Sequence, residues 1–275
     1  MKIKNCFLGS ALIGFFAGVV RILQYIFTID DRGFYTDSRF SSFMGGLLVG
    51  LLAAGVVWSI ACGLTQKKEQ ALFFQVFTKS TPTRVLFLIL AAVSLADGIL
   101  RWITAGLSIT PILCLAGGIA WFALGMSGVF LPLMELMPLL QLGGLIVDYF
   151  KHTYKYIQVT TYSLGLLGLC AIIYFALILI KVLSGAECTR RRLVSGSCIL
   201  LVFGSSSFLA PLADSFTLSG LIFAVHGFTY CLLAALTLIW LPEGKHVPTP
   251  PKDTPDPNEL DQYINEIPEV QEDEL

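Results

Sequence analysis

Long apolar segments recur along residues 1–241, and they constrain the fold more than any other feature of the sequence. A bilayer core about 30 Å thick is crossed by roughly 20 helical residues, at about 1.5 Å of rise per residue. Only 13% of the chain is charged, about half of the fraction usual in soluble domains. We therefore predict an all-α fold, a polytopic bundle of transmembrane helices. Seven segments are clear candidates for spans: 7–28, 42–64, 85–106, 110–131, 158–181, 193–212 and 217–241.

An eighth segment, residues 133–150, is harder to interpret because it contains Glu135 and Pro138. It could be a span, a re-entrant hairpin or an interfacial helix. Cytoplasmic loops of membrane proteins carry an excess of Lys and Arg. With eight spans and a cytoplasmic N-terminus, twelve of the eighteen Lys and Arg residues lie in the cytoplasm. With seven spans the cluster Arg190–Arg192 would lie outside, so we expect eight spans, keep seven as the alternative, and place both termini in the cytoplasm.

Eight spans also divide into two sets of four with the same orientation. The third span of each set carries the triplet Leu-Ala-Asp, which ends at Asp97 in the first set and at Asp214 in the second. Parallel repeats of this kind occur in transporters. A tripeptide also recurs by chance in a chain rich in leucine and alanine, so two parallel four-helix halves and a chance match are both open.

Residues 242–275 differ from the rest of the chain in charge and in proline content. They hold ten of the nineteen acidic residues and seven of the twelve prolines, but only two Lys or Arg residues. Such a segment has too little apolar surface to offset the entropy lost on ordering. We therefore divide the chain into a transmembrane helix bundle, residues 1–241, and an acidic, mostly disordered cytoplasmic tail. Leu260, Tyr263 and Ile267 follow helical spacing, so the tail is either a docking helix for a cytoplasmic protein or simply solvated.

Small residues recur every four positions in the first two spans. Such stripes let helix backbones approach each other closely in lipid. We expect them to pack spans together within one molecule, with a homodimer interface as the alternative. The residues are Ser10, Gly14 and Gly18 in the first span, and Gly46, Gly50 and Ala54 in the second.

Ionisable residues at membrane depth are the best candidates for a functional site, because burying a charge there costs about 2.5–3.5 kcal/mol or more. Counted from the expected cytoplasmic ends at about 1.5 Å per residue, four of them lie in one layer and a fifth lies just above it. We predict that this polar layer opens to the outside and binds a small solute or ion. Its residues are Arg21, Asp97, Arg101 and His226, with Asp214 just above them.

A purely structural role for these charges is the alternative to a solute site. Asp97 and Arg101 are four residues apart and can neutralise each other on one helix face. Arg21 then needs another partner, either Asp214 or a second contact with Asp97. Because two acids and two bases cancel, the same residues could form a buried network that only fixes the order of the helices.

The seventh span carries Gly-Ser-Ser-Ser at residues 204–207, followed by Pro211. These residues can unwind a helix in mid-membrane and free backbone groups for a ligand. Serine hydroxyls can equally bond back to the carbonyl groups of their own helix. Both interpretations of this segment are open.

No catalytic or cofactor motif stands out, and we expect neither an enzyme nor a bound cofactor. Gly-Met-Ser-Gly at residues 125–128 matches the serine motif of rhomboid proteases, with His226 as the candidate base. Ser127 and His226 differ in expected depth by roughly 16 Å, which is too far for a catalytic pair. The seven cysteines fall mostly inside the expected spans, without zinc-ligand spacing or a disulfide framework. We expect no metal site and no nucleic-acid partner.

Three short motifs resemble those of one group of membrane proteins. They are Arg-Ile-Leu-Gln at residues 21–24, before an aspartate-rich loop, Glu-Leu-Met-Pro at residues 135–138, and Ala213-Asp214. Together they are similar to an uncharacterised group of polytopic proteins of anaerobic Gram-positive bacteria, over most of residues 1–241. The resemblance implies a multi-pass protein of the bacterial plasma membrane and, since that group has no established activity, no particular chemistry.

Two functions of different class fit these features. The first is transport of a small solute or ion through an outward-facing polar layer. The second is a non-transporting membrane scaffold or sensor, in which the same charges fix helix packing and the acidic tail binds a cytoplasmic partner.

Overall fold

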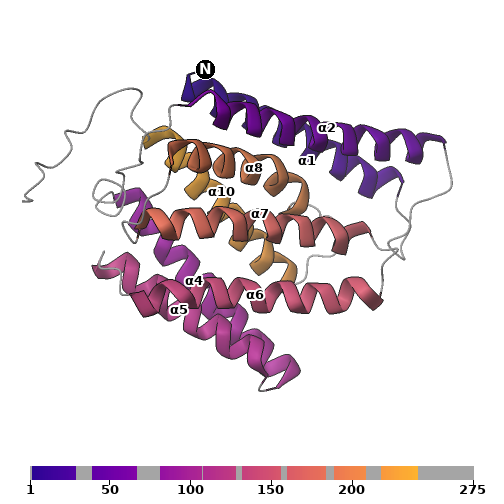
Figure 1. Ribbon diagram of the computed structural model, residues 1–275. Helices are drawn as coiled ribbons and strands as arrows, with labels where there is room; N and C mark the ends of the chain where they lie inside the picture. The colour runs from indigo at the N-terminus through magenta and orange to yellow at the C-terminus, as the bar shows by residue number, and fades with distance from the viewer. Residues whose placement is uncertain are drawn as a thin grey trace, which may run out of the picture. The chain divides into compact units, whose positions relative to one another are not determined.

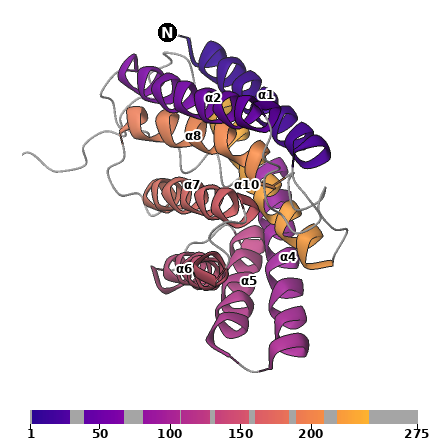
Figure 2. The same ribbon diagram turned by 90° about the vertical axis from the view of Figure 1, so that its right-hand side faces the viewer.

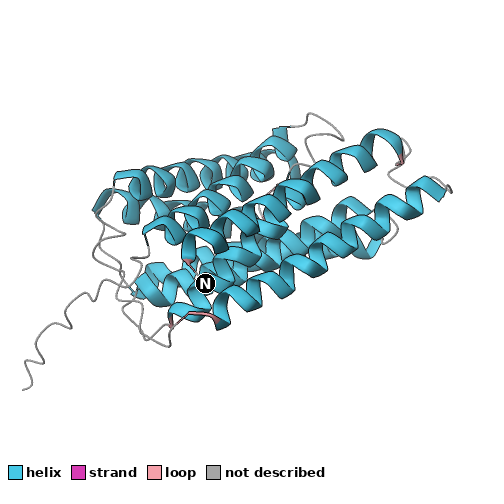
Figure 3. Ribbon diagram, turned by 90° about the horizontal axis from the view of Figure 1, so that it is seen from above, coloured by secondary structure: helices cyan, strands magenta, loops and turns pink. Residues whose placement is uncertain are grey.

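The computed structural model describes residues 2–28, 39–66, 81–106, 108–127, 132–155, 160–183, 189–208 and 218–240. Within these residues the regular structure consists of eight α-helices, which confirms the predicted all-α class (Figures 1 and 3). The helices are α1 (Ile3–Phe27), α2 (Arg39–Leu64), α4 (Thr81–Ala105), α5 (Ile109–Ser127), α6 (Pro132–Lys155), α7 (Thr160–Leu183), α8 (Arg190–Phe208) and α10 (Leu218–Trp240).

Each predicted apolar segment corresponds to one helix, although several helices extend beyond the apolar residues. Polar residues at the ends continue the hydrogen-bonded turns, so α2 begins at Arg39 and α8 begins at Arg190. Six helices are long and apolar enough to cross a membrane, namely α1, α2, α4, α5, α7 and α10. The apolar part of α6 is shorter, Leu136–Phe150, and α8 opens with three arginines. By length and composition the described helices therefore fit a multi-pass membrane protein, with six rather than eight helices meeting the requirement for a span.

The distribution of side chains is the reverse of that in a soluble protein. Large apolar side chains point outward on many helices, with Phe15 62%, Val57 68% and Ile103 77% exposed. Polar side chains, by contrast, lie inside the bundle, where Arg21 and Gln141 are fully buried. Soluble monomers rarely expose extended apolar surface, whereas lipid-facing helices require it. The apolar exterior is therefore a second observation that fits an integral membrane protein.

The helices of residues 1–241 pack as two groups, which are joined by α10 and by packing of α6 against α7. One group contains α1, α2 and α8, which all contact one another, with α7 against α8. The other contains α4, α5 and α6, with α5 in contact with both of its neighbours. Figure 2 shows α10 reaching from α8 towards α4, and it packs against both helices. This arrangement brings the third expected span, α4, next to the last one.

The two sets of four helices differ in their internal packing. Helix α7 packs directly against α8, whereas α2, which would correspond to α7, packs mainly against α1 and α8 rather than against α4. The described helices therefore do not pack as two copies of one arrangement. The chain also divides into the units Met1–Leu241 and Pro242–Leu275, and the second unit, with the acidic tail, lies outside the described residues.

The expectation that both small-residue stripes pack inside the molecule is wrong for the second stripe. In α1 the residues Ser10, Gly14 and Gly18 are buried. In α2, Gly46 and Gly50 are exposed with no side chain or other helix within 4 Å. Small-residue spacing shows that a helix has a smooth face but not which side of the bundle that face occupies.

Candidate functional site

The predicted pair of Asp97 and Arg101 forms an ion pair on α4. The guanidinium Nε of Arg101 donates to both carboxylate oxygens of Asp97, at 2.9 Å each. Because the residues are four apart, the two side chains lie on the same helix face. Asp97 is buried, whereas the Arg101 side chain is 28% exposed. The pair therefore lies at the edge of the helix bundle with its acid inward.

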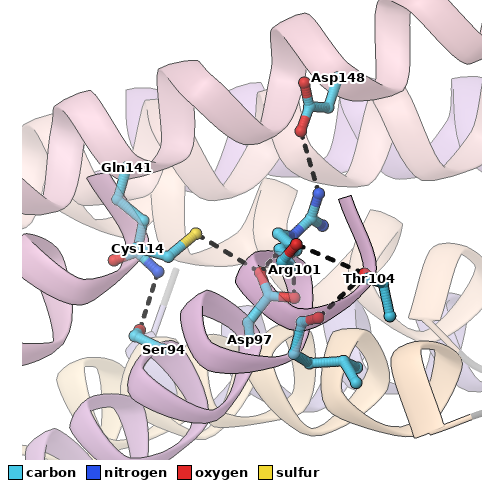
Figure 4. A network of polar contacts seen from close by, with 8 residues as sticks. Ser94, Asp97, Arg101, Thr104, Cys114, Gln141 and Asp148 are labelled. Atoms are coloured by element: carbon cyan, nitrogen blue, oxygen red, sulfur yellow. Dashed lines mark hydrogen bonds and ion pairs between the residues drawn. The ribbon is translucent and has the colours of Figure 1, made fainter. Parts of the chain in front are cut away.

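Arg101 also contacts a second acid that we had not included in the site. Its Nη1 atom donates to Oδ2 of Asp148 on α6 at 3.0 Å (Figure 4). Both residues lie near the outer ends of their expected spans, so matching depths could have suggested this contact. One guanidinium thus holds a carboxylate of its own helix, Asp97, and links α4 to α6 through Asp148.

Helix α5 adds a thiol to this group. The Cys114 Sγ atom, which is fully buried, donates to Oδ2 of Asp97 at 3.5 Å. Figure 4 shows the thiol and the guanidinium approaching Asp97 from different sides. We refer to Asp97, Arg101, Cys114 and Asp148 as the Arg101 cluster. It contains one cation and two carboxylates and draws on three helices.

A second polar contact joins α4 and α6 deeper in the bundle. The side-chain Nε2 of Gln141 donates to the Ser94 hydroxyl at 2.8 Å, and both residues are fully buried. Gly117 of α5 lies directly against the Gln141 amide, where any Cβ atom would collide with it. The missing side chain at residue 117 therefore gives Gln141 the space to reach past α5.

His226 of α10 faces the same region from the opposite helix. It is 4% exposed, and its helix packs against α4, which carries Asp97 and Arg101. Its ring lies 5.3 Å from that of Tyr230, which in turn is 6.1 Å from the Trp121 ring of α5. We refer to Trp121, His226 and Tyr230 as the His226 cluster. Three of the predicted site residues, Asp97, Arg101 and His226, thus lie on two helices that pack against each other, α4 and α10.

The His226 cluster contains buried polar atoms that have no hydrogen-bond partner. They are Nε2 of His226, the hydroxyl of Tyr230 and the indole Nε1 of Trp121. A buried polar group without a partner typically costs about 1–3 kcal/mol. Because the Tyr230 and Trp121 side chains also lie against each other, Nε2 of His226 is the group that a small polar molecule could satisfy. The two aromatic members had no signal in the sequence beyond their apolar surroundings.

Arg21 is not joined to the Arg101 cluster by its described contacts. Its Nη1 atom donates to Oε1 of Gln24 at 3.0 Å, and its guanidinium lies 5.0 Å from the centre of the Tyr25 ring. Both of these contacts are within α1, and the described contacts of Asp97 are with Arg101 and Cys114. The other expected partner, Asp214, lies outside the described residues.

The serine segment of α8 remains helical. Regular helix continues through Ser207 and ends at Phe208, and the Ser206 hydroxyl donates to the Phe203 carbonyl at 3.1 Å. The hydroxyl therefore bonds back to its own helix, which is the second of the two interpretations above. Pro211 lies outside the described residues.

Comparisons of this chain with protein-family models, with curated proteins and with solved structures found no match. In the part of the chain that the structure describes, no group of three His, Cys, Asp or Glu residues could hold a metal ion.

Proposed function

We propose that this chain is an eight-span protein of a bacterial plasma membrane that binds a small polar solute or ion beside Arg101 and carries it across. The observation that carries the proposal is His226 Nε2, a buried nitrogen without a partner, on the helix α10 that packs against α4, the helix of Asp97 and Arg101. Such a group is stabilised when a bound molecule supplies the missing hydrogen bond.

The directions of α4, α5 and α6 support a crossing by α6. Two contacts join α4 and α6, Ser94 with Gln141 and Arg101 with Asp148. Both helices advance seven residues between these contacts, about 10 Å of rise, so they run in the same sense. Helix α5 runs the opposite way, because Gly118 lies against Leu95 whereas Gly125 lies against Leu88. Three successive spans must alternate in this manner.

The contacts of α8 support its crossing in the same way. Gly55 of α2 lies against Val202, and Gly63 lies against the Arg191 carbonyl, so α2 and α8 run in opposite directions. With eight spans, α2 is the second span and α8 is the seventh. These two spans should cross the membrane in opposite directions. The arginines at the start of α8 then lie at the cytoplasmic end, with the N-terminus.

A topology experiment tests the eight spans. A reporter that is active only outside the cytoplasm would be fused after Lys155, and a second copy would be fused after Leu183 as the matched control. We expect activity after Lys155 and none after Leu183. A cytoplasmic result after Lys155 would contradict the crossing by α6 and favour seven spans.

Binding is tested on the purified full-length protein in detergent, by thermal unfolding with sodium, potassium, small organic cations and small carboxylates. We expect at least one probe to raise the Tm of the natural protein. Asp97→Asn and His226→Phe should stay folded and lose that shift, whereas Ser59→Ala, which removes a buried hydroxyl of α2, should keep it. A shift that survives both site variants would contradict the proposed site.

One observation favours a second function, a non-transporting scaffold or sensor. Arg101 holds both Asp97 and Asp148, so these charges satisfy one another without any ligand. In that case Asp97→Asn lowers the Tm and no probe shifts it. The acidic tail would then carry the function by binding a cytoplasmic protein, and deletion of residues 245–275 would abolish the cellular phenotype while the bundle stays folded.

A further inference from the structure

The starts of α1 and α8 and the end of α2 meet at one end of the bundle. The Cys198 Sγ atom of α8 donates to the Cys6 carbonyl of α1 at 3.9 Å. The Nε2 atom of Gln66, two residues beyond α2, lies 4.0 Å from the Cys6 sulfur. The Nε atom of Arg191 in turn donates to the Gln66 carbonyl at 2.7 Å. These contacts hold the three helix ends together, and Figure 1 shows the end of α2 beside the N-terminus.

Basic residues gather at this end of the bundle. We refer to Lys2, Lys4 and the three arginines 190–192 as the basic end cluster. Neither α1 nor α8 has an acidic residue in its first turn. Lys2, Lys4 and Arg192 are exposed, and none of the three forms an ion pair in the part of the chain that the structure describes. Because like charges repel one another, a bound anion would stabilise this cluster.

An exposed apolar stripe continues from Lys4 along α1. Leu8, Leu12 and Phe15 are 58%, 48% and 62% exposed. They follow Lys4 at steps of four, four and three residues, so all four side chains lie on one helix face. At about 1.5 Å per residue this face is roughly 16 Å long, which is close to half of the bilayer core of about 30 Å. A molecule with an anionic head and apolar chains of one leaflet therefore matches both the charge and the stripe.

We propose that this end of the bundle binds an anionic phospholipid, with its phosphate at the basic end cluster and its acyl chains along Leu8, Leu12 and Phe15. Groups of about four to eight Lys and Arg residues beside a membrane-spanning helix recognise anionic lipids in this way. Lys4 supplies the charge at the head of the stripe. The guanidinium of Arg192 offers paired N–H donors that fit phosphate oxygens.

The contacts among the helix ends prepare this site before the lipid arrives. Arg191 is held by the Gln66 carbonyl, so the arginines at the start of α8 are fixed beside the end of α2. A site that is already ordered loses less entropy on binding. This lipid site uses α1, α2 and α8, whereas the proposed solute site uses α4 and α10, so the two can be tested separately.

The test uses the purified full-length protein in detergent, titrated with phosphatidylglycerol and with phosphatidylcholine of the same acyl chains. Native mass spectrometry measures the lipid that stays bound. We expect phosphatidylglycerol to bind at least about tenfold more tightly, and less tightly as the ionic strength rises, because salt screens exposed charges. Glycerol phosphate, which has the head but not the chains, should bind far more weakly than the lipid. Equal affinity for glycerol phosphate and the lipid would overturn the proposal in favour of a free phosphate.

Charge variants locate the site. A Lys or Arg near an anionic surface contributes about fivefold in affinity, so Lys4→Gln combined with Arg192→Gln should weaken phosphatidylglycerol binding about 25-fold. Each single variant should lose about fivefold, which keeps the test valid if the double variant does not fold. Arg39→Gln is the control, because Arg39 is exposed at the opposite end of α2. The proposal is overturned if the two lipids bind equally, or if the control loses as much affinity as the double variant.

Discussion

Gln141 on α6 donates a hydrogen bond of 2.8 Å to the hydroxyl of Ser94 on α4, and it does so past a glycine of α5. All three helices therefore meet at one polar contact within an apolar interior. The oxygen of this amide, Oε1 of Gln141, has no hydrogen-bond partner. The Ser94 contact is thus the described bond that compensates for burying the Gln141 side chain.

Removing the Ser94 hydroxyl should destabilise the bundle more than removing both partners. Ser94→Ala leaves the buried amide of Gln141 without an acceptor for its Nε2 atom, whereas Ser94→Ala combined with Gln141→Leu leaves no such donor. Interhelical hydrogen bonds in membranes contribute on average about 0.6 kcal/mol, with maxima near 1.7 kcal/mol. A double-mutant cycle, measured by reversible unfolding in detergent, should give a coupling energy in that range. A coupling of zero would show that the hydrogen bond does not contribute.

Gly117→Ala should destabilise the protein by displacing Gln141. The added Cβ would collide with Oε1 of Gln141 and lie 2.9 Å from its Cδ atom. The amide would have to move away from Ser94 and lose its hydrogen bond, at a cost of about 1–3 kcal/mol. Gly46→Ala is the matched control, because no other group lies within 4 Å of that position. Thermal unfolding of the two variants should show a lower Tm for the first only.

Arg101→Lys should weaken the link between α4 and α6 although it keeps the charge. The planar guanidinium reaches Asp97 through Nε and Asp148 through Nη1, and a single ammonium group cannot reproduce both contacts. Hydrogen bonds to charged groups contribute about 1.5–3 kcal/mol each, so loss of one should lower the Tm measurably. Arg192→Lys, at an exposed position of α8, provides the control. Equal Tm values for the two variants would contradict a bridging role for Arg101.

The sequence could predict the helices because each crossing segment has to satisfy its own backbone hydrogen bonds in an apolar solvent. The pairing of Asp97 with Arg101 followed from spacing within one helix, since residues four apart are neighbours. The contacts between Arg101 and Asp148 and between Ser94 and Gln141 depend instead on how two separate helices are aligned. Local periodicity carries no information about that alignment, which is why both contacts were missed.

The stripe of α2 shows a second limit of sequence patterns. Gly46 and Gly50 follow the same spacing as the buried stripe of α1, yet they lie on the outer surface. The glycines of α2 that touch another helix lie on a neighbouring face of α2. Gly55 lies against Val202, and Gly63 lies against Arg191. A face can be identified from spacing, but its partner is decided by the packing of the other helices.

Deletion of residues 245–275 should leave the bundle folded. The chain divides at Leu241, and the deleted segment carries a large share of the acidic residues but little apolar surface. Its removal should therefore change the free energy of unfolding by less than about 1 kcal/mol. The Tm of the detergent-solubilised protein should stay nearly the same. A marked fall in Tm would show that the tail packs against the helices, and residues 1–241 would then not be a separate domain.

The common direction of α4 and α6 has a consequence for how the protein is made. The apolar part of α6 is shorter than the other candidate spans, and Gln141 and Asp148 would both face hydrocarbon if this helix entered the bilayer alone. The hairpin of α4 and α5 emerges from the ribosome first and presents Ser94 and Arg101 as ready acceptor and donor. On the proposed threading, the hairpin that precedes α6 therefore supplies the polar partners that α6 needs when it inserts into the membrane.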